Sequence, residues 1–249
     1  MIAIFCLRLA AGLTAALLIL SPAEVNPRFF RAQNWIALGL TIGAAIFARE
    51  FAPPMLWLTL GVSMALAFIG SVIWALEGAP GGRWVLALLA VVMATSLVLA
   101  EWSRDDVGPL SRRLAADAAS AVLLGAALTA MLLGHFYLIA PGMSLTPLLR
   151  VLSVLVIAIF LRMAVAGLGL WSWSAEHSMT NLMDVTVLWL PVRWGVGFIG
   201  PLILVWMAWR TARIRSTQSA TGILYVAVIF CFLGELTGQL LWQNTGVLL

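Results

Sequence analysis

The sequence predicts an all-α integral membrane protein, built as a bundle of about eight transmembrane helices with short loops. Of its 249 residues, 63% are hydrophobic and only 10% are charged, whereas about 25% of the residues of a soluble domain are charged. Apolar segments that approach the roughly 20 residues needed to cross a bilayer recur along the whole chain. Because no connecting segment is long enough to fold separately, we expect residues 1–249 to form a single polytopic membrane domain.

Each predicted span is an apolar run that stops at a polar cluster or at a proline or glycine breaker. The first run has neither a basic start nor a small-residue cleavage pattern, so we interpret it as a retained helix and not as a signal peptide. The second run is short and must borrow residues from a flank. In the seventh, Pro191 is expected to kink the helix. The predicted spans are 2–20, 34–48, 54–76, 83–100, 118–139, 147–170, 184–209 and 222–242.

All 14 basic residues are arginine, and their distribution predicts the orientation in a bacterial inner membrane. Basic residues favour the cytoplasmic side, and seven arginines follow the odd-numbered spans while four lie on the opposite side. Both termini are therefore expected on the non-cytoplasmic side. The arginines are scattered at membrane edges and form no basic patch, which excludes nucleic acid as a partner. The two groups are Arg28, Arg31, Arg83, Arg150, Arg210, Arg213 and Arg215, and Arg49, Arg104, Arg112 and Arg113.

Glu235 lies inside the last span, where a carboxylate costs about 2.5 to 3.5 kcal/mol on insertion scales. Counting about 1.5 Å per residue places Arg162 at a similar depth, about 20 Å from the arginine-rich side. An ion pair between the two would neutralise both charges, although Arg8 is a competing partner. Two interpretations follow: a structural Arg162–Glu235 pair, or a Glu235 carboxylate that handles protons at a bound quinone or ion.

Five further residues have side chains suited to a membrane site. His135 can donate a hydrogen bond to a quinone carbonyl or accept the proton of a quinol, since histidine exchanges protons near neutral pH; the alternative, which the position favours somewhat, is an interfacial histidine in an aromatic belt. Arg193 lies about nine residues inside the seventh span, so it should face protein or water. On the opposite side, Trp171, Trp173 and His177 form either an interface or the cap of a cavity, although interfacial tryptophans need no function.

No redox, nucleotide or hydrolase motif is visible, so we predict no catalytic residue and no metal site. His135 and His177 lie at opposite ends of the membrane, which argues against a bis-histidine haem; a His135–methionine pair stays open because ten methionines are available. Cys6 and Cys231 match neither a haem attachment site nor an iron–sulfur pattern. We therefore expect no haem or iron–sulfur cluster within this chain.

The C-terminal helices resemble those of the haem-free, quinol-handling membrane anchors of dimethyl sulfoxide reductases and polysulfide reductases. The similarity rests on eight helices, on the pair Arg193-Trp194, and on the run Gly234-Glu235-Leu236-Thr237-Gly238-Gln239, where the family often has Gly-Glu-Leu-x-Gly-Arg. It covers roughly the last 60 residues, and Gln239 replaces the arginine. The resemblance implies a subunit that binds quinone between helices, passes electrons to an iron–sulfur or cytochrome partner, and is inactive alone.

The expected function is therefore that of a membrane anchor in a respiratory or photosynthetic electron-transfer complex, with His135, Arg162, Arg193 and Glu235 at a quinone or proton-transfer site. Whether the chain takes part in an enzyme at all stays open. The alternative is a structural or assembly subunit whose buried charges specify packing and which binds lipids or pigments. A small transporter is a third interpretation, although the sequence has no half-chain repeat of the kind that many transporters carry.

Overall fold

Every regular element in the described part of the chain is a helix. The computed structural model describes residues 1–49, 52–76, 81–104, 109–140, 142–176 and 183–246. The predicted all-α fold class is therefore confirmed for these residues. The helices are α1 (Ile2–Leu18), α2 (Pro27–Phe47), α3 (Pro54–Ile73), α4 (Gly82–Trp102), α5 (Leu110–Ile139), α6 (Thr146–Glu176), α7 (Met183–Trp194), the π-helical turn η2 (Gly195–Ile199), α8 (Gly200–Arg213) and α9 (Thr217–Thr245).

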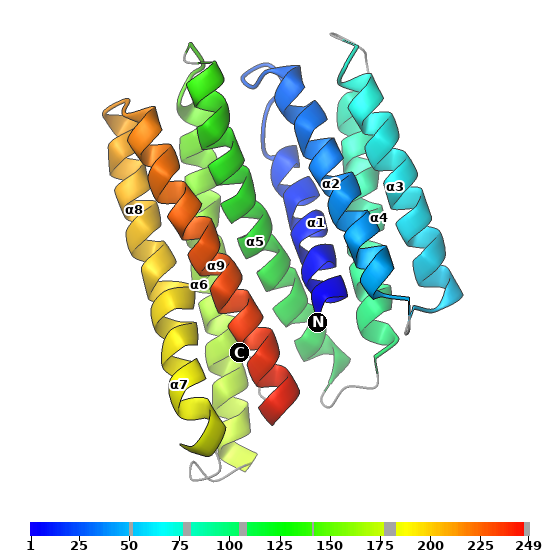
Figure 1. The fold of residues 1–249 in the computed structure, drawn as a ribbon, viewed down its shortest axis with the longest axis vertical. Helices are drawn as coiled ribbons and strands as arrows, with labels where there is room; N and C mark the ends of the chain where they lie inside the picture. Colours follow the sequence, from blue (N-terminus) through cyan, green and yellow to red (C-terminus); the bar gives the residue numbers. More distant parts are fainter. Residues whose placement is uncertain (50–51, 77–80, 105–108, 141, 177–182, 247–249) are drawn as a thin grey trace.

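The helices form two halves that repeat one connectivity (Figure 1). In the first half, α1 and α3 each pack against both α2 and α4. In the second half, α5 and α8 each pack against both α6 and α9, and α7, η2 and α8 follow one another as a single column. The halves meet chiefly where α1 packs against α5. The fold is thus internally repeated, although the sequence alone shows no such repeat.

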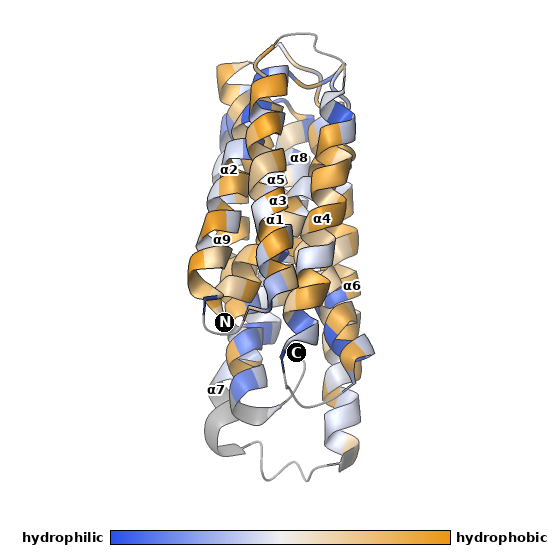
Figure 2. Cartoon of the chain, turned by 90° about the vertical axis from the view of Figure 1, so that its right-hand side faces the viewer, coloured by the Kyte–Doolittle hydropathy of each residue, from blue (hydrophilic) through white to orange (hydrophobic). Residues whose placement is uncertain are grey.

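In the part of the chain that the structure describes, six helical segments are long and apolar enough to cross a membrane. α1 is apolar but shorter, at 17 residues, and α2 begins with the polar run Arg28, Arg31, Gln33 and Asn34. These apolar helices are typical of an integral membrane protein, but within the described residues length and composition support six spans where the sequence predicted about eight. Hydrophobic residues cover most of the length of the columns, with hydrophilic residues nearer both ends (Figure 2).

Several helices extend beyond their predicted spans, and they extend furthest at the starts of α2 and α5, in both cases for local reasons. The second helix begins at Pro27, because the Asn26 side chain accepts a hydrogen bond from the Arg28 backbone N–H at 2.9 Å and caps it. The fifth helix begins at Leu110 and not at 118, so that Arg113 and Asp117 are helical. The first part of α5 was not predicted as helical because its hydropathy is low. This part contains Arg113 and Asp117, which bring charged groups into the bundle.

The two halves cross at a pair of glycines that lack the side chains to keep the backbones apart. A Cβ atom on Gly12 of α1 would overlap the backbone carbonyl of Ala121 in α5, and one on Gly125 would overlap the backbone of Gly12. Small residues let membrane helices approach closely, and van der Waals contact then stabilises their association. Gly12 and Gly125 therefore set the spacing between the halves.

Substituting Gly12→Ala should force α1 and α5 apart and lower the free energy of unfolding by about 1 to 3 kcal/mol, the usual cost of overpacking. The matched control is Gly61→Ala in α3, where an added Cβ meets no atom within 4 Å. Thermal unfolding in detergent should show a lower midpoint for Gly12→Ala and an unchanged or higher midpoint for Gly61→Ala. Equal midpoints for the two variants would contradict the close crossing.

Candidate functional site

Glu235 is fully buried and binds partners from three other helices. Its Oε1 atom lies 2.9 Å from Arg193 Nη2 and 3.2 Å from Arg162 Nε, and Ser120 Oγ donates to Oε2 at 2.5 Å. The side chains of Glu235 and Arg193 are 0% exposed and that of Arg162 is 4% exposed. The pairing of Arg162 with Glu235 is confirmed, and Arg193 joins it. One carboxylate thus ties together α5, α6, α7 and α9.

Arg193 lies between Pro191 and a π-helical turn. Pro191 has no backbone N–H to donate, and the column passes through the π-helical turn η2 four residues later. There, Gly197 meets Gly234 of α9 so closely that a Cβ on Gly197 would lie 2.8 Å from the Gly234 Cα. This contact lets the guanidinium of Arg193 reach Glu235 while its flat face lies 4.3 Å from the centre of the Phe198 ring.

A second group of charges lies nearer the end of the bundle that carries both termini. Arg8 of α1 forms an ion pair with Asp117 of α5, so it is not the partner of Glu235. Glu101 at the end of α4 lies 3.1 Å from Arg104 and 3.4 Å from Arg113. The sequence did not predict these contacts, because Arg113 and Asp117 lie before the predicted fifth span, in what was expected to be a loop. Their i, i+4 spacing, which puts both on one helix face, was the available signal.

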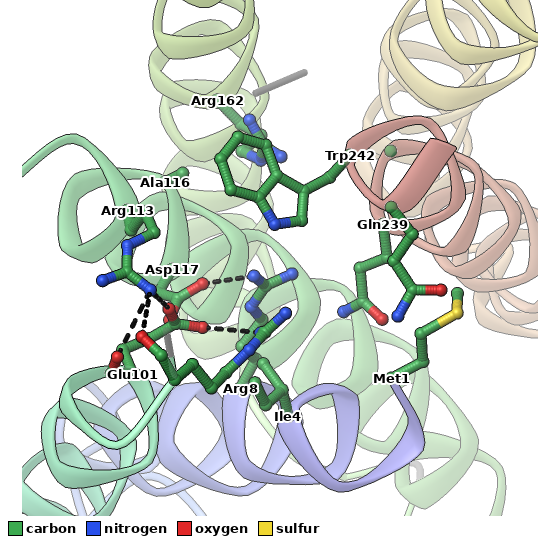
Figure 3. A pocket seen from close by; sticks show the side chains of 13 residues that line it. Met1, Ile4, Arg8, Glu101, Arg113, Ala116, Asp117, Arg162, Gln239 and Trp242 are labelled. Carbon is green, nitrogen blue, oxygen red and sulfur yellow. Dashed lines mark hydrogen bonds and ion pairs between the residues drawn. The ribbon is translucent and has the colours of Figure 1, made fainter. Parts of the chain in front are cut away.

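The two groups enclose a narrow polar cleft at the meeting of both halves, which we name the junction cleft. It has a volume of about 30 Å³ and is lined by side chains from α1, α4, α5, α6 and α9. In Figure 3, Gln239 from α9 faces Arg8 and Asp117 across it. Arg162 lies on its inner wall, so the cleft reaches the Glu235 network. The polar residues that line it include Arg8, Glu101, Arg113, Asp117, Arg162 and Gln239.

An apolar groove, which we name the outer groove, lies at the same end on the outward surface of α5 and α6. Its volume is about 510 Å³. Trp171, which the sequence suggested as a cavity cap, lines it and is 77% exposed. Arg112 and Ser172 are the polar residues of its lining, and Ala115, Val165, Leu168 and Gly169 complete it.

The remaining predicted residues lie elsewhere. His135 is exposed, and its Nδ1 atom lies 3.3 Å from the Tyr225 hydroxyl. It follows Ser120 by 15 residues in α5, which corresponds to about 22 Å along the helix, so it does not share a site with Glu235. Trp173 is part-buried and packs near Leu241. His177 lies outside the described residues.

Comparison of the chain with models of known protein families, with curated proteins and with solved structures gave no match.

Replacing only Glu235 by leucine should leave two buried guanidinium groups without their carboxylate and cost about 3 to 5 kcal/mol of stability. The matched comparison is the triple variant Arg162→Leu, Arg193→Leu, Glu235→Leu, because an apolar replacement of a complete buried ionic group is often neutral. Thermal unfolding should rank the wild type and the triple variant well above Glu235→Leu. A triple variant as unstable as Glu235→Leu would contradict a network balanced by its own charges.

The substitution Gly234→Ala should separate α9 from η2 and lower stability by about 1 to 3 kcal/mol, because the added methyl group meets Gly197 backbone. Gly222→Ala in the same helix is the control, since a Cβ there meets nothing within 4 Å. The measurement is again the unfolding midpoint in detergent. An unaffected Gly234→Ala protein would show that the glycine contact does not position Arg193.

Proposed function

We propose that this chain is the quinol-handling membrane anchor of an electron-transfer complex, in which it works with a redox partner subunit. The observation that carries the proposal is the junction cleft, a polar route that runs from one end of an apolar bundle to Arg162, and through it to the buried Glu235. Ionisable groups at such depth are expensive and commonly mark proton relays or substrate pathways. The eight helical columns agree with the resemblance seen in the C-terminal sequence.

The outer groove is the proposed place for the quinol ring. Its volume of about 510 Å³ falls within the range of about 300 to 1,000 Å³ that is usual for small-molecule sites. It is mostly apolar, which suits the ring and its isoprenoid tail, and the hydroxyl of Ser172 and the guanidinium of Arg112 supply hydrogen-bonding groups. Its wall residue Ala115 directly precedes Ala116 of the junction cleft in the chain, so α5 contributes to both sites.

The redox partner would bind at the end of the bundle where the cleft and the groove both open. The arginine distribution favours the non-cytoplasmic side of a bacterial inner membrane for this end, and the sequence resemblance implies an iron–sulfur or cytochrome subunit there. In this arrangement the chain supplies quinol binding and a proton route, while electrons leave through the partner. It is therefore inactive alone.

Bound phospholipid is a further proposed partner. At the opposite end of the bundle, Trp206, Trp209, Arg210 and Arg213 of α8 line a groove of about 630 Å³ with Val156 of α6. The Arg210 guanidinium lies 5.3 Å from the centre of the Trp206 ring. Aromatic rings beside arginines are typical of the level of lipid headgroups, where the cation meets phosphate.

A structural or assembly subunit is the second candidate, favoured by one specific observation. Both oxygens of Glu235 are bound, one by two guanidinium groups and the other by the Ser120 hydroxyl and Arg162. A carboxylate that is satisfied in this way fixes how four helices pack. On this interpretation the network has no part in turnover.

The variant Glu235→Gln distinguishes the two candidates, because it keeps the shape of the side chain and removes its charge. If Glu235 takes part in proton transfer, the complex purified from native membranes should keep its subunits but lose about 100-fold in quinol-dependent turnover, the lower range of a general acid–base contribution. Mass spectrometry of the co-purified chains reports assembly, and a quinol oxidation assay reports turnover.

The control is Glu24→Gln, which makes the same change in an ion pair at the opposite end of the bundle, where Glu24 lies 3.1 Å from Arg150 and is partly exposed. It should leave turnover unchanged. An assembled Glu235→Gln complex with normal turnover would reject the proton-transfer role and favour the structural subunit.

A further inference from the structure

Gln239 is buried without using its hydrogen-bonding capacity. Its side chain lines the junction cleft and the residue is 8% exposed, yet neither its amide nitrogen nor its amide oxygen has a hydrogen-bond partner within the described residues. An unsatisfied polar group of this kind costs about 1 to 3 kcal/mol. A buried primary amide that faces a polar cleft therefore indicates an occupant that both accepts and donates hydrogen bonds.

Two other cleft residues need the same kind of occupant. Asp117 uses Oδ1 to bind Arg8, and its buried Oδ2 atom accepts no hydrogen bond from a nitrogen or hydroxyl donor of the described residues; its other side-chain contact is with the neighbouring Glu101 carboxyl group. The Arg8 Nε atom is likewise buried with no acceptor among those residues. The open positions thus comprise two donors and two acceptors, counting both ends of the Gln239 amide.

Because both donors and acceptors are open, the occupant of the cleft must itself both accept and donate hydrogen bonds. An anion can satisfy the Arg8 and Gln239 donors, but it would lie against the Asp117 carboxylate and leave the Gln239 carbonyl oxygen without a donor. A metal cation would face the guanidinium groups of Arg8, Arg113 and Arg162. Water both donates and accepts, and a site holds one at about 10 to 15 Å³. The volume of about 30 Å³ accommodates about two.

We propose that the junction cleft is a hydrated site, in which about two waters bind the Gln239 amide, Asp117 Oδ2 and Arg8 Nε and connect the aqueous phase at this end of the bundle with Arg162. This goes beyond the proposed function, because it applies whatever reaction the Glu235 network serves. The water gives the network contact with solvent from one side of the membrane. Gln239 is the main residue that binds this water. Position 239, where the similar anchors often have arginine, therefore has its own role in this protein.

The test uses radiolytic labelling, in which X-rays generate hydroxyl radicals from bound as well as bulk water, so that neither the size nor the charge of a reagent matters. The probe is Ile4→Cys, because Ile4 lines the cleft and is 3% exposed. The control is Ile46→Cys on the outward face of α2, which is 57% exposed. Both positions lie at the same end, since Ile4 packs with Ala44 and Ala45. Cys6 and Cys231 are first replaced by alanine.

In lipid nanodiscs, mass spectrometry should show Ile4→Cys oxidised several-fold faster than Ile46→Cys, despite its lower exposure. Adding Gln239→Leu to the Ile4→Cys protein should reduce its rate to that of the control, because the waters lose their main ligand. Oxidation of Ile4→Cys no faster than that of Ile46→Cys would overturn the proposal, and this comparison stands even if Gln239→Leu does not fold. Since the assay measures no turnover, its failure is distinct from failure of the quinol proposal.

Discussion

The second half of this protein depends on one carboxylate placed between two guanidinium groups. Without Glu235, Arg162 and Arg193 would each bring an unpaired charge into an apolar bundle, which is far more costly than an apolar residue at the same place. With it, four helices acquire a common contact point whose geometry is set by hydrogen bonds and ion pairs of 2.5 to 3.4 Å. Non-directional apolar packing between membrane helices tolerates sliding and rotation, whereas this contact does not. The Glu235 network therefore fixes the register of these four helices relative to one another as well as their association.

The sequence predicted the parts of this arrangement that depend on depth and periodicity. Glu235 and Arg162 could be paired by counting residues, because a helix of known rise converts sequence position into depth. The same counting could not select Arg193 or Ser120, since it gives depth and not the direction in which a side chain points. It also failed for Asp117 and Arg113, where low hydropathy resembled a loop. The role of Gly234 was invisible as well, because a close backbone contact depends on Gly197, a residue on another helix that sequence spacing alone cannot assign as its partner.

The internal repeat of the fold bears on whether this protein is a transporter. A repeated connectivity with a polar cleft between its halves is a common arrangement in transporters, and the absence of a visible sequence repeat does not exclude it here. The small volume of the junction cleft argues against a transporter. At about 30 Å³ it is far below the several hundred Å³ that organic ligands occupy. Protons and water fit this space in the described structure, which agrees better with a role in proton access than with transport of a solute.

The π-helical turn has a consequence for the other end of its column. Such a turn takes up one extra residue, and each residue of an α-helix advances by about 100° around the axis. Seventeen residues separate Arg193 from Arg210, which in an unbroken α-helix would place them about 100° apart around the axis. With one residue absorbed at Gly195–Ile199, the separation becomes about 160°. The π-helical turn thus rotates α8 relative to α7 about the helix axis. Because of this rotation, one continuous column can direct Arg193 into the protein and Arg210 outward at the membrane edge.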